Sequence, residues 1–158
     1  MKLVNLKKSI LVVGGSSPII PFIKRCQEIG YEVVCCDKNV NAPCKNYANY
    51  FYPVDATDNL KVLEIAKKHN VSAASTYAAD PLSPTAAFVS EKLDLIGNPY
   101  ESVRLLTQKH KFRTFLKSNG FKVPFFQVHN SLNEAFEALS DFKSDCFIKP
   151  VDSSGSKG

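Results

Sequence analysis

The sequence lacks any run of about 20 consecutive apolar residues, the length that a membrane-spanning helix requires. The apolar part of residues 1–8 is also too short for a signal peptide. No internal repeat or low-complexity tract interrupts the chain. These absences predict no membrane span, no membrane partner and a cytoplasmic location.

The five cysteines form no Cys-x-x-Cys pair and no Cys/His cluster with the spacing of zinc ligands. Their number is odd, and Cys35 and Cys36 lie inside an apolar run. We therefore predict reduced, buried thiols, as in cytosolic proteins, and no metal site. The five are Cys26, Cys35, Cys36, Cys44 and Cys146.

Patterns for nucleophilic catalysis and for nucleic-acid binding are also missing. The three histidines, His69, His110 and His129, are expected at the surface, and none belongs to a Ser/His/Asp or Cys/His arrangement. The net charge of +5 comes from lysines spread along the chain, not from a basic stripe interleaved with aromatic residues. We expect no nucleic-acid partner, whereas a mildly basic protein suits an anionic small ligand.

Strands and helices alternate through about the first hundred residues. Apolar, partly β-branched runs predict the strands, and apolar residues at helical spacing predict the helices between them. This alternation is typical of an α/β fold with a Rossmann-like parallel sheet. Pro53 places the third strand at a sheet edge, and Thr57 is expected to cap the second helix. The expected strands are 10–13, 31–36, 51–54 and 71–76, with helices at 18–29, 57–66 and 84–93.

The carboxyl ends of parallel strands meet at one edge of a sheet, where ligands of such folds bind. Small and polar residues follow all four expected strands, although glycine and aspartate also favour loops for conformational reasons alone. These residues are Gly14-Gly15-Ser16, Asp37, Asp55 and 77–80. Among them we take Gly15, Ser16, Tyr77 and Asp80 as candidate substrate-binding residues.

A second unit is expected to begin after the turn at Gly97-Asn98-Pro99. Within it, Ser131 and Glu134 match the Ser-x-x-Glu capping box at a helix start. We therefore divide the chain into a Rossmann-like domain at 1–97 and an incomplete α+β subdomain at 98–158. The expected elements of the second unit are helices at 100–106, 108–118 and 131–139 and strands at 125–128 and 146–149.

The last ten residues combine a lysine at the end of an apolar strand with a Gly/Ser-rich loop. Small residues let successive backbone N–H groups point at phosphates, and a lysine meets a phosphate as a point charge. A lysine without such a loop would more simply extend into solvent. Lys149 and the loop together predict a nucleotide site of which only part is present.

Neither glycine-rich segment matches a standard nucleotide fingerprint. The C-terminal loop lacks the Gly-x-x-x-x-Gly-Lys-Ser/Thr pattern, and Gly14-Gly15 lacks the third glycine of the dinucleotide motif. Asp37 does lie about 20 residues after that pair, where a ribose-binding acid would fall. Two alternatives therefore stay open: the NAD(P)-binding domain of an oxidoreductase, and a non-catalytic nucleotide-binding module.

The order of these parts resembles the N-terminal half of an ATP-grasp ligase of the carbamoyl-phosphate-synthetase-like or phosphoribosylglycinamide-synthetase-like type. The resemblance rests on the Rossmann-like domain, on Thr107-Gln108-Lys109 with Phe112-Arg113, on Val123-Pro124, and on Ile148-Lys149-Pro150 before the loop. It implies that Lys109 and Lys149 contact the ATP phosphates. It also implies that the loop closes over them, with Ser153, Ser154, Gly155, Ser156, Lys157 and Gly158.

In such ligases ATP phosphorylates a carboxylate, and an amine then displaces the phosphate from the acyl phosphate. The resemblance implies ATP and Mg²⁺ as cofactors, and small-molecule carboxylate and amine substrates. It places the catalytic residues and the magnesium ligands after Gly158, so we expect no metal ligand here and no activity from this chain alone. A homodimer is an open alternative for its assembly.

Overall fold

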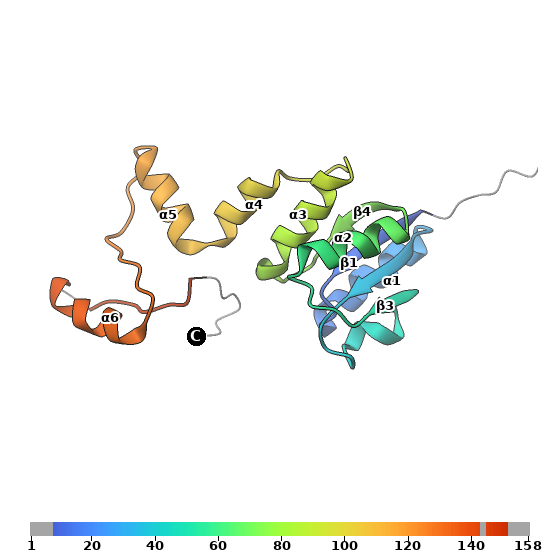
Figure 1. Ribbon diagram of the computed structural model, residues 1–158, viewed down its shortest axis with the longest axis horizontal. Coiled ribbons are helices and arrows are strands. Elements are labelled where there is room, and N and C mark those ends of the chain that lie inside the picture. The colour runs from blue at the N-terminus through green and yellow to red at the C-terminus, as the bar shows by residue number, and fades with distance from the viewer. Residues whose placement is uncertain (1–7, 143–144, 152–158) are drawn as a thin grey trace, which may run out of the picture.

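The computed structural model describes residues 8–142 and 145–151 and begins with a four-stranded parallel sheet (Figure 1). Its strands are β1 (Ser9–Val13), β2 (Glu32–Cys36), β3 (Tyr50–Tyr52) and β4 (Val71–Ser75). The strand order is β3-β2-β1-β4, so β1 is central and β3 lies at an edge. The predicted α/β class, the four strands and the edge position before Pro53 are confirmed.

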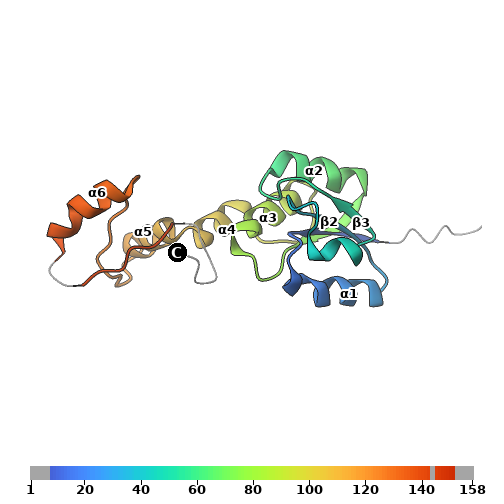
Figure 2. The same ribbon diagram turned by 90° about the horizontal axis from the view of Figure 1, so that it is seen from below.

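Helices cover both faces of this sheet, α1 on one side and α2 on the other (Figure 2). The β1 side chains alternate accordingly, since Leu11 packs with α2 (Asn59–Lys68) and α3 (Ser83–Lys92), whereas Val12 packs with α1 (Ile20–Glu28). All five β1 residues are buried, as expected for a central strand of a parallel sheet. The structure therefore has two apolar clusters, one on each face.

The cap of α2 differs from the prediction. Asp58, not Thr57, is the N-cap residue, and its carboxylate accepts the Lys61 backbone N–H at 3.2 Å. Thr57 instead donates its backbone N–H and its hydroxyl to Asp55 Oδ1, at 2.9 and 2.7 Å. Both residue types cap helices, but the Thr57 hydroxyl is already hydrogen-bonded within the turn at Asp55.

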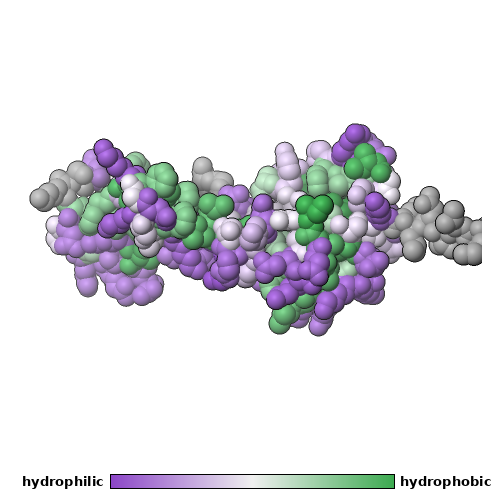
Figure 3. Space-filling model, turned by 90° about the horizontal axis from the view of Figure 1, so that it is seen from above, coloured by the Kyte–Doolittle hydropathy of each residue, from purple (hydrophilic) through white to green (hydrophobic). Residues whose placement is uncertain are grey.

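The second part of the chain leaves the sheet and carries α4 (Tyr100–Thr107), α5 (Lys109–Ser118) and α6 (Leu132–Glu137) (Figure 1). No described residue after Ser90 is buried. Large apolar side chains are correspondingly exposed, and they colour part of this surface green in Figure 3. They include Leu106, Phe115, Phe121, Phe125, Val128, Leu132, Phe136, Leu139, Phe147, Ile148 and Val151.

The helices of the second part are confirmed, but its two predicted strands are wrong. Residues 121–129 and 145–151 are irregular, although their apolar patterns favoured strands at 125–128 and 146–149. A strand forms only when a neighbour accepts and donates its backbone hydrogen bonds, and no described segment does so here. The capping box does form, because Ser131 Oγ accepts the Glu134 N–H at 3.2 Å.

Tyr100 fastens α4 to the sheet domain. Its hydroxyl accepts a hydrogen bond from Asn59 Nδ2 at 3.2 Å, and the buried Thr85 hydroxyl donates to Asn59 Oδ1 at 2.8 Å. The Tyr100 ring also meets Phe88 edge to face. Within the described ranges, none of the helices has the length and apolarity to span a membrane.

The unequal burial of the two parts predicts unequal effects of truncating a side chain. Leu11→Ala removes a fully buried side chain of β1, so we expect it to lower the free energy of unfolding by about 2–5 kcal/mol. Phe136→Ala, at a side chain that is 58% exposed on α6, should change it by no more than about 0.5 kcal/mol. Urea unfolding followed by circular dichroism measures both, and equal losses would contradict this distribution of the core.

His69, which follows α2, predicts how stability depends on pH. Its Nε2 lies 2.7 Å from the Tyr52 hydroxyl, and burial together with Lys68 holds the pKa of His69 below its ordinary value, against a smaller opposing effect of Glu32. The unfolded chain therefore binds a proton at a higher pH than the folded chain. The stability that His69 contributes should be complete above about pH 6.5 and should decrease as the pH falls through the lowered pKa. Urea unfolding between pH 5 and 8 should show a flatter profile for His69→Gln, and identical profiles would contradict the assignment.

Candidate functional site

Asp37 ties together the loops that follow β1 and β2. Its Oδ2 accepts the Gly15 backbone N–H at 2.6 Å, and its Oδ1 accepts the Asn39 N–H at 2.8 Å. Gly14 N–H donates to the carbonyl of Cys36, the last residue of β2. The acid that a dinucleotide fold would direct to a ribose is here engaged with its own glycine loop.

Close packing is what requires the two glycines of this loop. Gly14 has φ +98°, and a Cβ built on it would lie 2.6 Å from Leu82 Cδ1. A Cβ on Gly15 would lie 2.5 Å from Cys44 Sγ and 2.9 Å from Ala42 Cβ. Real Cβ atoms essentially never come within 3.0 Å of such neighbours, so any larger residue would displace the loop or the side chains around it. The sequence analysis interpreted this glycine pair as part of a ligand site. It did not predict the contacts with Leu82 and Cys44, because no local sequence pattern places these two residues beside the loop.

The four candidate substrate-binding residues lie in the loops after β1 and β4. Ser16, Tyr77 and Asp80 are exposed, whereas Gly15 is buried. The two loops are neighbours, because the Thr76 hydroxyl donates to the Val13 carbonyl at 2.7 Å. The Tyr77 ring stacks on Phe22 of α1 with centroids 6.5 Å apart. Thr76, which connects the loops, was not recognised from the sequence.

A backbone hydrogen bond brings the two predicted phosphate lysines into neighbouring segments. Lys109 N–H, at the start of α5, donates to the Val151 carbonyl at 3.1 Å, two residues after Lys149. The Lys149 Nζ lies 5.5 Å from the centroid of the Phe147 ring, as expected when residues two apart share one side of an extended chain. The predicted loop residues Ser153 to Gly158 lie outside the described residues.

The start of α5 is unusually basic. Lys109, His110 and Lys111 open the helix, its first turn contains no acidic residue, and its N-cap Gln108 makes no side-chain capping bond. Positive side chains at a helix N-terminus oppose the helix dipole, each by about 0.3–1 kcal/mol. An anion at this place would interact favourably with the helix dipole. His110 Nδ1 is enclosed and has no hydrogen-bond partner in the described part of the chain.

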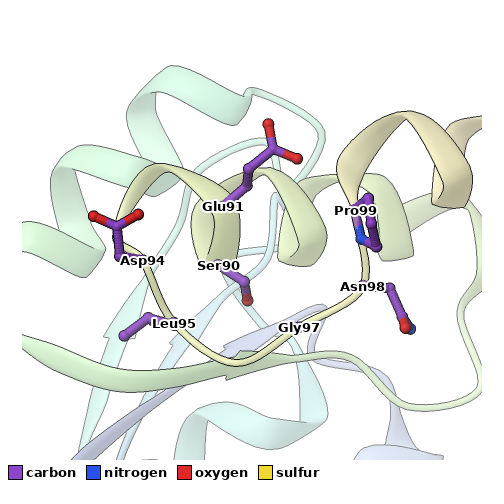
Figure 4. A pocket seen from close by; sticks show the side chains of 7 residues that line it. All are labelled: Ser90, Glu91, Asp94, Leu95, Gly97, Asn98 and Pro99. Carbon is purple, nitrogen blue, oxygen red and sulfur yellow. The ribbon is translucent and has the colours of Figure 1, made fainter.

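The pocket of about 390 Å³ shown in Figure 4 lies elsewhere, where α3 joins α4. None of its lining residues is a predicted site residue, and the carboxylates of Glu91 and Asp94 do not converge in it. Glu91 Oε2 instead accepts the Tyr100 N–H at 2.9 Å. Over residues 8–142 and 145–151, no three His, Cys, Asp or Glu side chains gather to hold a metal ion. The pocket marks the joint between the two parts and offers no nucleotide site.

The chain is similar in sequence to parts of known proteins. No protein-family model matches the chain. The carbamoyl phosphate synthase large chain of Pseudothermotoga lettingae is 32% identical over 130 residues, covering 78% of this chain and 12% of that protein. The formate-dependent phosphoribosylglycinamide formyltransferase of a Sulfurovum species is 32% identical over 140 residues, covering 84% of this chain and 34% of that protein.

A solved structure agrees at the level of the fold. Phosphoribosylglycinamide synthetase from Anaerococcus prevotii superposes with a TM-score of 0.67 at 23% identity, covering 87% of this chain and 35% of that one. The chain thus spans between about an eighth and about a third of the length of the relatives it matches. In sequence and in fold, the chain is a homologue of ATP-grasp ligases that corresponds to part of their length.

Proposed function

We propose that the chain provides part of the ATP site of an ATP-dependent carboxylate–amine ligase that works through an acyl phosphate. The observation that carries the proposal is the hydrogen bond from Lys109 N to Val151 O, because it joins the two segments that hold the predicted phosphate lysines. The three relatives described above, which are a synthase, a synthetase and a formyltransferase by name, support the same class of chemistry.

Lys109 and Lys149 would neutralise charge on the phosphates of ATP. Phosphoryl transfer gains most from positioned positive charge and little from covalent participation of the protein. The N-terminus of α5 adds backbone N–H groups and a positive dipole to these two charges. Residues 153–158, which lie outside the described residues, are predicted to belong to the same site, and Mg²⁺, when bound, would supply further positive charge to the phosphates.

The exposed residues after β1 and β4, Ser16, Tyr77 and Asp80, would hold the carboxylate or amine substrate. We place the boundary between the substrate-holding domain, 1–97, and the ATP-binding part, 98–158, at the turn before α4. The core clusters support this division, since every buried residue among those that the structure describes lies between Ser9 and Ser90. A cytoplasmic location agrees with such a metabolic role.

The nicotinamide alternative receives less support. A dinucleotide would need the Gly15 loop for its pyrophosphate and the Asp37 carboxylate for its ribose. Here the carboxylate accepts the Gly15 N–H at 2.6 Å, which occupies the donor and puts a negative charge where the pyrophosphate would lie. A non-catalytic nucleotide-binding module would use the same two lysines and differs only in having no turnover.

The chain should bind ATP at the joined lysine segments. In a titration with Mg²⁺-ATP followed by backbone amide NMR, we expect shifts concentrated at 108–111 and 149–151. Lys149→Ala or Lys109→Ala should weaken binding by about 10–100-fold, because each removes a hydrogen bond to a charged group worth about 1.5–3 kcal/mol. Lys122→Ala, at an exposed lysine after α5, is the matched control and should leave affinity unchanged. Equal effects of all three variants, or NADH shifts at Gly15 and Asp37, would contradict the assignment.

We expect the 158-residue chain to have no catalytic activity by itself. It corresponds to no more than about a third of the relatives compared above, so we expect no ATP hydrolysis that depends on an added carboxylate. A phosphate-release assay with a panel of small carboxylates and amines measures this directly. Carboxylate-dependent hydrolysis that disappears in Lys149→Ala would show that the chain contains a complete catalytic site.

A further inference from the structure

Two buried sulfur atoms lie in direct contact beneath the Gly14-Gly15 loop. Cys35 is in β2, and Cys44 is in the short 3₁₀ helix at Pro43–Asn46 that follows. Their Sγ atoms are 2.9 Å apart, and neither residue is exposed to solvent. A disulfide bond has an S–S distance of about 2.05 Å, so the pair needs only roughly 1 Å of approach to close.

The other cysteines are placed differently. Cys36 points to the opposite face of the sheet, where it packs in the cluster with α2 and α3. Cys26 belongs to the same apolar cluster as Cys35, but it lies on α1 and no sulfur contact joins it to another cysteine within the described ranges. Cys146 is partly exposed in the second part of the chain. The contact therefore singles out one pair among the five cysteines.

We propose that Cys35 and Cys44 are a redox-active pair that a peroxide converts into a reversible disulfide. Neither the contact nor its oxidation depends on the proposed ligase function.

The hydrogen bonding assigns the two sulfurs different roles. The bond from the Cys35 thiol lowers the pKa of Cys44, although burial opposes the shift. The same hydrogen bond, followed by burial, raises the pKa of Cys35. The Cys35 thiol has one proton for two acceptors, Cys44 Sγ and the Gly14 carbonyl at 3.4 Å, and turns to the sulfur when Cys44 ionises. Cys44 is then the nucleophile, because the thiolate is the reactive form.

The reaction balances with one molecule of hydrogen peroxide. The Cys44 thiolate attacks a peroxide oxygen, the O–O bond breaks, and the leaving hydroxide takes the former thiol proton to become water. Cys44 is now a sulfenic acid. The Cys35 sulfur attacks the Cys44 sulfur, the S–O bond breaks, and the second water leaves with the Cys35 proton. Two thiols lose two electrons, and one peroxide becomes two waters.

The oxidant reaches the pair through local opening of the segment between β2 and β3. Residues 37–49 contain no strand or α-helix, and much of the segment is exposed. Segments with few buried contacts open at a lower free energy than the rest of a domain. The buried pair should therefore react with a small peroxide more readily than with a bulky oxidant.

The disulfide would act directly on the Gly14-Gly15 loop. Cys44 N–H donates to the Gly15 carbonyl at 3.0 Å, and Cys44 Sγ would lie 2.5 Å from a Cβ built on Gly15. Oxidation removes the Cys35 thiol proton from Gly14 O and draws Cys44 toward β2. The conformation of the loop that leads to Ser16 thus depends on the redox state of the pair. This dependence would regulate substrate binding if the proposed function holds.

Peptide mapping of the oxidised 158-residue chain tests the proposal. The reduced protein is treated with equimolar hydrogen peroxide under native conditions, alkylated and digested with trypsin. We expect the number of free thiols to fall from five to three. Mass spectrometry should show the peptide 26–38 linked to the peptide 39–45, and dithiothreitol should release both. Because Cys26, Cys35 and Cys36 share the first peptide, its fragment ions must place the link at Cys35. Oxidation of Cys146 alone, or a link through Cys26 or Cys36, would overturn the proposal.

Variants identify the sulfurs and keep the test independent of the fold. Cys36→Ser is the matched control and should retain the 26–38 to 39–45 link. Cys35→Ser should abolish it and leave Cys44 as a sulfenic acid that a cyclic diketone probe captures. Circular dichroism checks that each variant folds, and the wild-type map decides the question if Cys35→Ser does not. A link that persists in folded Cys35→Ser protein would also refute the pairing, whatever the outcome of the ATP titration.

Discussion

Burial of β1 on both faces is the constraint on which the rest of the sheet domain depends. All five of its residues are buried, so helices must cover both sides of the sheet. Parallel strands then have to be joined by crossovers, which bring their carboxyl ends to one edge. The Gly14-Gly15 loop, Asp37 and Thr76 meet there because β1 lies between β2 and β4. The candidate substrate site is a consequence of this arrangement.

The second part of the chain is organised by different means. Its described residues are not buried, and its contacts include the Tyr100 hydrogen bonds to the sheet domain and the bond between Lys109 N and Val151 O. That last bond holds an extended segment against a helix N-terminus. The proposed phosphate site combines the basic residues of α5 with Lys149, since each of these positive charges would favour an anion.

The sequence predicted the sheet domain well because its apolar runs and helical periodicities are strong and local. The predictions from the sequence were wrong where an element forms only with a partner that is distant in the sequence. Phe125 to Val128 and Cys146 to Lys149 have the composition of strands, but no described segment pairs with them. Thr57 and Asp58 are both residue types that cap helices, and the hydrogen bonds of Thr57 to Asp55 leave the cap position to Asp58. The contact between Lys109 and Val151 could not be predicted, because no local pattern connects residues so far apart. The same is true of the contact between Cys35 and Cys44, which is set by how an irregular loop folds back under Gly15.

The central claim is that Lys109 and Lys149 form one phosphate-binding site. An acyl-phosphate derivative of ATP, which transfers its acyl group to lysines beside the bound phosphates, tests it most directly. Mass spectrometry of the labelled chain should find the acyl group on Lys109 and Lys149, and excess ATP should suppress the labelling at both. Labelling spread evenly over the exposed lysines and insensitive to ATP would contradict the account.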